Sequence, residues 1–382
     1  MVKKAWVYGI SLFMLLSLQS CETMRIPTIY DGQIYGVKHI TVPGRKIHLR
    51  KSETQLPIEK DWIPEKYLKR YGSVDEMMTK TNTTAFLVMK NGAVIYEKYY
   101  NGITKGELTQ IFSVSKTITT TMLGVALQEG KIKSLNQKVC EFIPSFKKPG
   151  LNEITLLHLA QMRSGLNYDE YKKIFQTLKF YHTKNLNKAV SNPELKYKPG
   201  TKFTYKSIDN QLLGMCISKA VGMPFTEYVN KKLFSKIGIE DSIEWSVDSK
   251  ENKQPKFYGG LNISARDLAK FGQLIANDGV INGKIILGNM TNTFCTDTTR
   301  RNGEDEYCNG WWYNEWSDDA DVFFGAGFKG QILMIDKTDD VVIVRLGKNK
   351  GGIKWYEMLK NLCTQIPGQK DIGDNGLATK DK

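Results

Sequence analysis

Two tetrapeptides in the sequence place a serine three residues before a lysine, a spacing that can generate a nucleophile. They are Ser113-Val114-Ser115-Lys116 and Ser145-Phe146-Lys147-Lys148. Ser113 opens an apolar segment of helical periodicity, whereas Ser145 lies between two prolines. At a helix start, residues three apart share a face, so the Lys116 amine can reach the Ser113 hydroxyl. The unpaired N–H groups there can hold the oxyanion formed when a serine attacks a carbonyl.

A serine hydroxyl is a poor nucleophile until a base removes its proton. The four histidines of the chain lie in no catalytic motif and show no metal-ligand spacing, and no Gly-x-Ser-x-Gly segment is present. Lys116 is therefore the candidate base, provided that burial or a nearby positive charge lowers its pKa from the usual ~10.4. The tetrapeptide alone favours the structural alternative, an N-cap serine and a solvated lysine.

Two later segments supply polar groups and close backbone approach. Tyr205 and Ser207 lie in a Pro- and Gly-containing turn just before an apolar helix. Gly325-Ala326-Gly327 leads into a strand. Glycine there would allow a ligand to lie against the strand edge and accept backbone hydrogen bonds.

The elements that must position these residues follow a simple order along the chain. Strand-like runs at 84–89 and 93–100 flank an Asn-Gly turn, and two more occur at 331–335 and 341–346. Helical periodicity marks the segments between and after them, at 113–130, 154–166, 208–221, 225–237, 265–277 and 353–365. The order predicts an α/β fold of the α+β type, in which both chain ends build one antiparallel sheet around a mostly helical insert. We expect the active site at the seam between sheet and insert.

The ordered motifs resemble those of the serine β-lactamase and penicillin-binding-protein superfamily. The resemblance runs from about Thr84 to Leu346 and favours the branch of class C β-lactamases, esterases and 6-aminohexanoate-dimer hydrolase. Non-catalytic stretches contribute to it, namely 154–159, 163–166, 199–201, 211–214, 259–261 and 266–269.

The resemblance implies roles for individual residues. Ser113 matches the acylated nucleophile, Lys116 its base partner, and Tyr205 the tyrosine that relays a proton to the leaving group. The N–H of Phe328 matches the second oxyanion donor beside that of Ser113. Ser207 stands where the family often has asparagine, so a shorter side chain would bind the substrate there.

Gly325-Ala326-Gly327 stands where the family has Lys-Thr-Gly or His-x-Gly. The missing charge at Gly325 disfavours β-lactams and peptidoglycan stems, whose carboxylates such a charge would bind. Gly325 and Gly327 remain candidates for substrate binding, as do Tyr168 and Lys329. Trp311 and Trp312 are interpreted as packing residues or a pocket wall.

The leading hypothesis is a serine hydrolase that cleaves a small ester or amide without a metal or cofactor. A β-lactamase or D-alanyl-D-alanine carboxypeptidase is the second hypothesis. A catalytically silent penicillin-binding fold that serves as a binding module is the third, because Ser207 and Gly325 depart from the family pattern.

The first twenty residues have the pattern of a secretory signal. Lys3 and Lys4 precede an apolar run from Ala5 to Leu18, and Leu18-Gln19-Ser20-Cys21 resembles a bacterial lipobox. A lipid on Cys21 would anchor the protein to the membrane of the bacterial envelope without spanning it. An ordinary cleaved signal is the alternative. An exported chain meets an oxidising compartment, where Cys295 and Cys308 are close enough in sequence to pair, whereas Cys216 fits a helical core.

These patterns divide the chain into a signal at 1–20, a linker with an irregular extension at 21–80, a hydrolase domain at 81–366 and a disordered tail at 367–382. The helical insert is expected at about 131–255. The 382 residues carry a net charge of +14, but acids are interspersed with bases and no basic block occurs, so nucleic-acid binding is not expected. No prediction of oligomeric state follows from the sequence.

Overall fold

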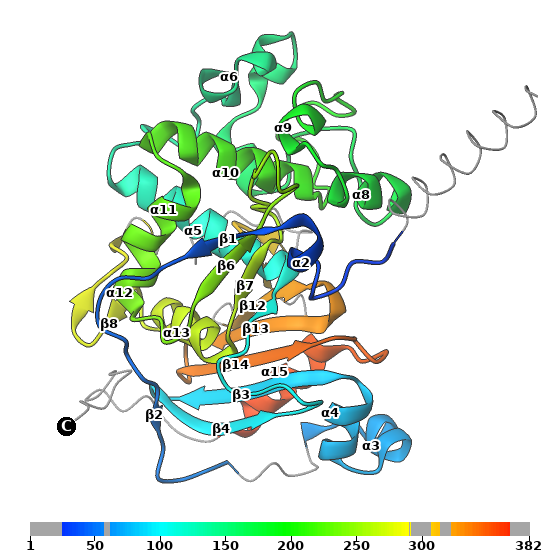
Figure 1. Ribbon diagram of the computed structural model, residues 1–382, viewed down its shortest axis with the longest axis vertical. Coiled ribbons are helices and arrows are strands. Elements are labelled where there is room, and N and C mark those ends of the chain that lie inside the picture. The colour runs from blue at the N-terminus through cyan, green and yellow to red at the C-terminus, as the bar shows by residue number, and fades with distance from the viewer. Residues whose placement is uncertain (1–24, 57–61, 290, 292–306, 314–321, 367–382) are drawn as a thin grey trace, which may run out of the picture.

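A computed structural model describes residues 25–56, 62–289, 291, 307–313 and 322–366. Its centre is an eight-stranded sheet with the strand order β10-β11-β12-β13-β14-β3-β4-β2 (Figure 1). The predicted joining of both chain ends is confirmed, because β14 (Val341–Gly347) pairs antiparallel with β3 (Thr83–Lys90). β3 also pairs with β4 (Ala93–Tyr99), and β13 (Gln331–Asp336) lies between β14 and β12 (Val322–Gly327). The edge strands are β10 (Tyr307–Cys308) and β2 (Arg50–Lys51), and β11 (Trp311–Tyr313) pairs with β10 on one side and β12 on the other.

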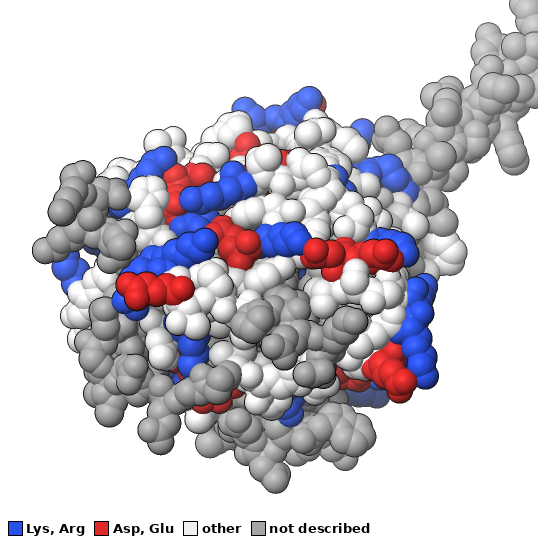
Figure 2. All heavy atoms as spheres, turned by 90° about the horizontal axis from the view of Figure 1, so that it is seen from below, with Lys and Arg blue, Asp and Glu red and all other residues white. Residues whose placement is uncertain are grey.

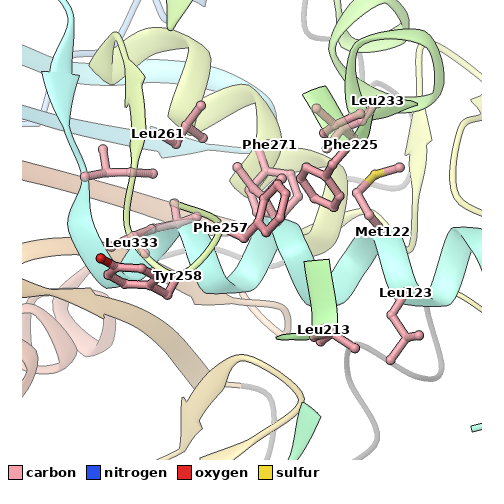
Figure 3. Packing of buried hydrophobic residues seen from close by; sticks show 14 of the residues in the cluster. Met122, Leu123, Leu213, Phe225, Leu233, Phe257, Tyr258, Leu261, Phe271 and Leu333 are labelled. Carbon is pink, nitrogen blue, oxygen red and sulfur yellow. The ribbon is translucent and has the colours of Figure 1, made fainter. Parts of the chain in front are cut away.

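The helix that follows the candidate nucleophile runs through the middle of the molecule. Every residue from Ser115 to Ala126 in α5 (Ser115–Gln128) is buried, as expected of a core helix. Its threonine hydroxyls donate to carbonyl oxygens, for example Thr117 to Val114 at 2.8 Å and Thr119 to Phe257 at 3.0 Å. Met122 and Leu123 face Leu213, Phe225 and Phe257 in one apolar cluster (Figure 3). The central helix is thus fixed on all sides, which makes its first turn a rigid platform.

Helices cover both faces of the sheet. α13 (Ala265–Ala276) packs on β13, β14 and β3, on the same face as α5. The other face carries α15 (Trp355–Gln365), α3 (Glu65–Tyr71) and α4 (Val74–Lys80), which share a second apolar cluster that includes Trp62, Phe86 and Trp355. On the face shown in Figure 2, basic and acidic side chains lie next to each other.

The helical region lies above the sheet in Figure 1. Its longest member is α10 (Ser207–Val221), followed by a continuous helical stretch of α11 (Phe225–Val229), a π-helical turn (Asn230–Phe234) and α12 (Ser235–Ile237). Shorter helices are α6 (Val139–Phe142), α7 (Leu156–Ala160), α8 (Ile174–Tyr181) and α9 (Leu186–Ala189), with 3-10 turns at Pro144–Lys147 and Leu151–Glu153.

Two sequence predictions differ from the structure. The helix expected at 154–166 is only α7, because Met162 (φ 56°) and Gly165 (φ 78°) take left-handed backbone conformations that end it. The extension expected to be irregular contains α2 (Gly32–Tyr35), α3, α4 and two strands. One of them, β1 (Val37–Ile40), belongs to a separate four-stranded sheet with β6 (Ile243–Ser246), β7 (Leu261–Ile263) and β5 (Thr109–Gln110).

A small hairpin, β8 (Val280–Ile281) and β9 (Lys284–Ile285), completes the strands. The signal at 1–20, Cys21, Cys295 and the tail at 367–382 lie outside the described residues. Within the described part, no helix has the length and apolar character needed to cross a membrane.

Candidate active site

Ser113 lies in a 3-10 turn (Phe112–Val114) that leads directly into α5. Phe112, just before it, has a φ of 45°, a left-handed conformation that an aromatic residue adopts only at a cost of about 1 kcal/mol or more. The turn is closed by the N–H of Val114, which donates to the carbonyl of Ile111 at 3.2 Å. Ser113 is half-buried, whereas both its neighbours are buried. The fold therefore holds one accessible hydroxyl at the start of a buried helix.

Lys116 is fully buried, and its amine contacts three oxygen atoms. Lys116 Nζ lies 2.7 Å from Ser113 Oγ, 3.2 Å from Ser207 Oγ and 2.9 Å from the carbonyl oxygen of Tyr258. An ammonium would donate to all three. A neutral amine would donate to Ser207 and Tyr258 and turn its lone pair toward Ser113. The geometry thus suits a lysine that accepts the serine proton.

Burial lowers the pKa of Lys116 to about 8, because the ammonium loses its hydration, and the negative charge of Glu170 opposes this change. Part of the Lys116 population then carries an uncharged amine between neutral and mildly alkaline pH. A lysine base needs a lowered pKa, and here loss of hydration lowers it rather than a neighbouring cation.

Glu170 is a site residue that the sequence did not reveal. Its Oε2 accepts hydrogen bonds from the Ser207 hydroxyl at 2.7 Å and the Ser207 N–H at 2.9 Å. Ser207 is the first residue of α10, so the carboxylate also lies at the positive end of that helix. Ser207 therefore links Lys116 to Glu170, and the site contains a hydrogen-bonded series from Ser113 through Lys116 and Ser207 to Glu170.

Tyr205 is enclosed by aromatic rings next to the nucleophile. Its ring stacks on Tyr171 at 5.6 Å between centroids, and Trp312 and Tyr307 lie at 5.3 and 5.5 Å. Lys116 Nζ is 5.0 Å from the Tyr205 ring centroid. Burial and the charge of Glu170 raise the pKa of Tyr205, while a hydrogen bond with Ser113 opposes them. Tyr205 is therefore a neutral phenol at the nucleophile, in the state needed to donate a proton.

The turn between Tyr205 and Ser207 is tied down by a buried ion pair. Lys206 Nζ lies 3.6 Å from the carboxylate of Asp209 and donates to the carbonyl of Met162 at 3.3 Å. Asp209 accepts the hydroxyl of Ser164 at 2.6 Å. Lys206 thus points into the protein, so that its two neighbours face the nucleophile.

Gly325 and Gly327 lie in β12, beside the nucleophile turn. A Cβ at Gly325 would lie 2.9 Å from Thr117 Cγ2, and one at Gly327 would lie 2.4 Å from the carbonyl oxygen of Ile111. The structure thus gives a packing reason for these glycines in addition to the predicted ligand contact: they let β12 pack against α5 and the turn that carries Ser113. A charged side chain at position 325 has no space.

Phe328 begins the tight turn between β12 and β13, and its ring meets that of Phe112 edge-on at 5.6 Å. The first N–H groups of a helical turn have no acceptor within that turn. The N–H groups of Ser113 and Phe328 remain the predicted oxyanion donors. Arg345, fully buried, donates to the carbonyls of Lys329 and Gly330 at 2.8 and 2.9 Å and so fixes this turn.

The other predicted site residues are less central. Tyr168 is buried and packs edge-on against Phe180. Lys329 is half-buried with its amine 5.0 Å from the Phe328 ring centroid. Trp311 is a core residue stacked on Phe271, whereas Trp312 forms the wall behind Tyr205. Among the described residues, no group of three or more metal-ligating side chains occurs.

A family model described as Beta-lactamase matches residues 73–354. The chain belongs to this family. Its members in the comparisons include hydrolases, and the β-lactamase-fold chain described here is accordingly a hydrolase of the serine type.

Individual relatives agree with this family. The 6-aminohexanoate-dimer hydrolase of Paenarthrobacter ureafaciens is 24% identical over 303 residues, which cover 72% of this chain and 75% of the relative. A structure solved under the name of a 6-aminohexanoate-dimer hydrolase from Bacillus anthracis superposes with a TM-score of 0.74 at 23% identity, covering 89% of this chain and 92% of the other. A family VIII carboxylesterase superposes with a TM-score of 0.61 at 14% identity, covering 86% and 100%. These structures share the fold.

Sequence reasoning named Ser113, Lys116, Tyr205 and Ser207, which the structure brings together. It missed Glu170, Tyr258 and Arg345. Glu170 follows the Ser164-Gly165-Leu166 segment closely, yet no spacing distinguishes its carboxylate from the many on the surface. Tyr258 contributes its backbone carbonyl, which no side-chain pattern encodes, and its ring centroid lies 5.8 Å from Lys116 Nζ.

Proposed function

We propose that this enzyme hydrolyses a small ester or amide through an acyl-enzyme on Ser113. The observation that carries the proposal is the 2.7 Å contact between Ser113 Oγ and the buried amine of Lys116, whose pKa is lowered to about 8. The 6-aminohexanoate-dimer hydrolase relative and the carboxylesterase neighbour support this pair of bond types.

In the first half-reaction, neutral Lys116 accepts the Ser113 proton as Oγ attacks the carbonyl carbon. The oxyanion is held by the N–H groups of Ser113 and Phe328. The tetrahedral intermediate collapses as Tyr205 gives a proton to the leaving oxygen or nitrogen, and Tyr205 regains a proton from the Lys116 ammonium. This leaves an ester on Ser113 and a neutral Lys116.

In the second half-reaction, water attacks the acyl carbon and gives one proton to Tyr205, whose own proton passes to neutral Lys116. The acid product leaves as the Lys116 ammonium returns this proton to Ser113 Oγ. Glu170 acts through Ser207: it orients the hydroxyl that accepts from Lys116, and its charge keeps the lysine pKa from falling further.

The close packing of β12 at Gly325 favours an ester or amide over a β-lactam as the substrate. The buried position of Gly325, packed against Val114 and Thr117, leaves no room for a side chain that would bind a β-lactam carboxylate from this strand. We expect the enzyme to hydrolyse a nitrophenyl ester and not a chromogenic cephalosporin. The reverse preference would favour the β-lactamase hypothesis.

The decisive experiment is a fluorophosphonate probe on the purified protein, with the adduct mapped by mass spectrometry. A single adduct on Ser113 is expected, lost in Ser113→Ala and kept in the matched control Ser145→Ala. An unlabelled protein, or an adduct on Ser145, would refute the mechanism and favour a silent binding module.

We further propose that the enzyme is exported and anchored by a lipid on Cys21, based on the lysine-led apolar run that ends at this cysteine. Metabolic labelling with a fatty acid tests this. We expect the wild-type protein to carry the label and Cys21→Ser to carry none. An unlabelled wild type would favour an ordinary signal peptide that is cleaved without lipidation.

A further inference from the structure

Most of the large apolar side chains that are exposed in the described part of the chain belong to two segments. Six of these eight side chains lie at 26–34 and 171–175, namely Ile26, Tyr30, Ile34, Tyr171, Ile174 and Phe175. The exposed fractions of the six range from 44 to 71%. Single exposed apolar residues are ordinary on a protein surface, whereas a group of them marks a surface that binds a partner.

Helix α8 presents apolar side chains to solvent as well as to the core. Its inward side includes Phe180 and Tyr181, which are buried. An apolar stripe at the spacing i, i+3, i+4 and i+7 begins just before the helix and comprises Tyr171, Ile174, Phe175 and Leu178. This spacing places side chains along one side of a helix, and such a side normally faces the core. Here Ile174 is 54% exposed and Phe175 66%, so the α8 stripe has the composition of an interface but faces solvent.

The segment that carries the α8 stripe is also basic. Residues 171–188 contain five lysines and no acidic residue. Lys172 and Lys179, which flank Ile174 and Phe175 in the sequence, are exposed. Apolar side chains with lysines beside them are typical of helices that lie in the headgroup region of a bilayer with anionic lipids. The charge of the segment therefore favours an anionic membrane surface as the partner.

The N-terminal segment connects the proposed lipid anchor to this helix. His182, directly after α8, lies with Nε2 2.7 Å from the carbonyl oxygen of Arg25 and with Nδ1 2.5 Å from the Tyr35 hydroxyl. The described chain thus begins beside α8 (Figure 1). Arg25 follows Cys21 by four residues, which span at most ~14 Å. A lipid on Cys21 would therefore hold the bilayer close to α8.

We propose that the α8 stripe, together with Ile26, forms a face that docks on a bilayer containing anionic phospholipids. The proposal rests on the proposed lipid anchor, which brings this face to the membrane. A second copy of the chain fits less well, because a two-fold interface would set the lysines of 171–188 in one copy against those of the other. The Tyr171 ring stacks on that of Tyr205 at 5.6 Å. Docking would thus set the catalytic groups next to the membrane surface.

Flotation with lipid vesicles tests the docking face without a lipid on the protein. The chain from Glu22 onward lacks the apolar run at 5–18 and Cys21 but keeps every residue of the described fold. We expect it to float with vesicles made of equal parts phosphatidylglycerol and phosphatidylcholine, and to float less at high salt. In the double variant Ile174→Ser/Phe175→Ser, the ratio of bound to free protein should fall at least ten-fold, because two large apolar side chains no longer leave water. Both residues are exposed, so the urea midpoint should stay unchanged.

Ile285→Ser is the matched control. Ile285 is 75% exposed, but it lies in the hairpin of β8 and β9, on the opposite side of the molecule from α8 in Figure 1. This variant should float like the wild type. An equal loss in both variants, or a wild-type chain that does not float, would overturn the proposal. Equal flotation with vesicles of phosphatidylcholine alone would overturn the role of the lysines.

Failure of the lipid anchor is recognised separately, by a wild-type protein that takes up no fatty-acid label. The docking face is then tested by depth: Phe175→Trp should be quenched by vesicles with brominated acyl chains more than the wild type is, and Ile285→Trp should not. Equal quenching of the two variants would refute the docking face. A wild-type dimer in sedimentation equilibrium that dissociates in the Ile174→Ser/Phe175→Ser variant would identify a second copy as the occupant and overturn the membrane assignment.

Discussion

Replacing Glu170 by glutamine should move the pH dependence of catalysis to lower pH. Glu170 favours the ammonium form of Lys116, because a negative charge nearby stabilises a positive one. Glutamine removes that charge but keeps an oxygen that can accept from Ser207. Since the base must be unprotonated, kcat/KM rises with pH through the pKa of Lys116, and any fall in this pKa moves the rise to lower pH.

The structure sets the size of the effect. Hydrogen bonds of 3.2 and 2.7 Å connect Lys116 Nζ to Glu170 through the Ser207 hydroxyl. Across roughly 6 Å, an effective dielectric constant of about 20 to 60 gives an attraction of about 1 to 3 kcal/mol. Because ~1.4 kcal/mol corresponds to one pH unit, the rise should move from about 8 to between ~6 and ~7.

The assay needs no knowledge of the natural substrate. The rate of fluorophosphonate labelling at Ser113 and kcat/KM for nitrophenyl acetate are measured between about pH 5.5 and 9.5, with spontaneous hydrolysis subtracted. The midpoint of the rise is the quantity compared, because it is insensitive to a uniform loss of activity from imperfect positioning.

The control is Glu194→Gln, which neutralises an exposed carboxylate that accepts from Asn167 at 3.3 Å, away from Lys116. Its midpoint should equal that of the wild type. A midpoint in Glu170→Gln that stays in place or moves to higher pH would refute the electrostatic role. A lower rate with an unchanged midpoint would reduce Glu170 to a residue that positions Ser207.

Two further variants probe the elements that hold the oxyanion donors. Gly327→Ala places a methyl group 2.4 Å from the carbonyl oxygen of Ile111, so β12 must move away from the nucleophile turn. The fluorophosphonate labelling of Ser113 should therefore slow at least ~10-fold. The control is Ala326→Ser, the neighbouring position in β12, which should label at the wild-type rate. Arg345→Met leaves the carbonyls of Lys329 and Gly330 without their donor. The free energy of unfolding, measured by urea titration, should fall by about 3 kcal/mol. An unchanged urea midpoint would show that these carbonyls find other donors.

The sequence predicted the parts of the fold whose signals are local. The hairpin at 84–100 follows from two strand-like apolar runs around an Asn-Gly turn, and α10 from helical periodicity. The second sheet was not predicted, because β5 and β7 are two- and three-residue strands that exist only through pairing with distant segments. Periodicity over so few residues carries no information.

The candidate site divides in the same way. Ser113 and Lys116 are three residues apart on one helix, so their contact is local and visible in the sequence. Glu170 reaches Ser207 across 37 residues, and Arg345 reaches its carbonyls from a neighbouring strand. Such contacts depend on how loops and strands meet in space. The sequence can name the residues that react, but not those that set their pKa or hold their backbone.

The packing around Ser113 limits how a substrate can be recognised beside the nucleophile. On the β12 side, Val114 and Thr117 occupy the space next to Gly325, so an anion-binding side chain there would require α5 and β12 to separate. Recognition of a charged substrate from this strand would therefore need a different arrangement of the main chain around the nucleophile.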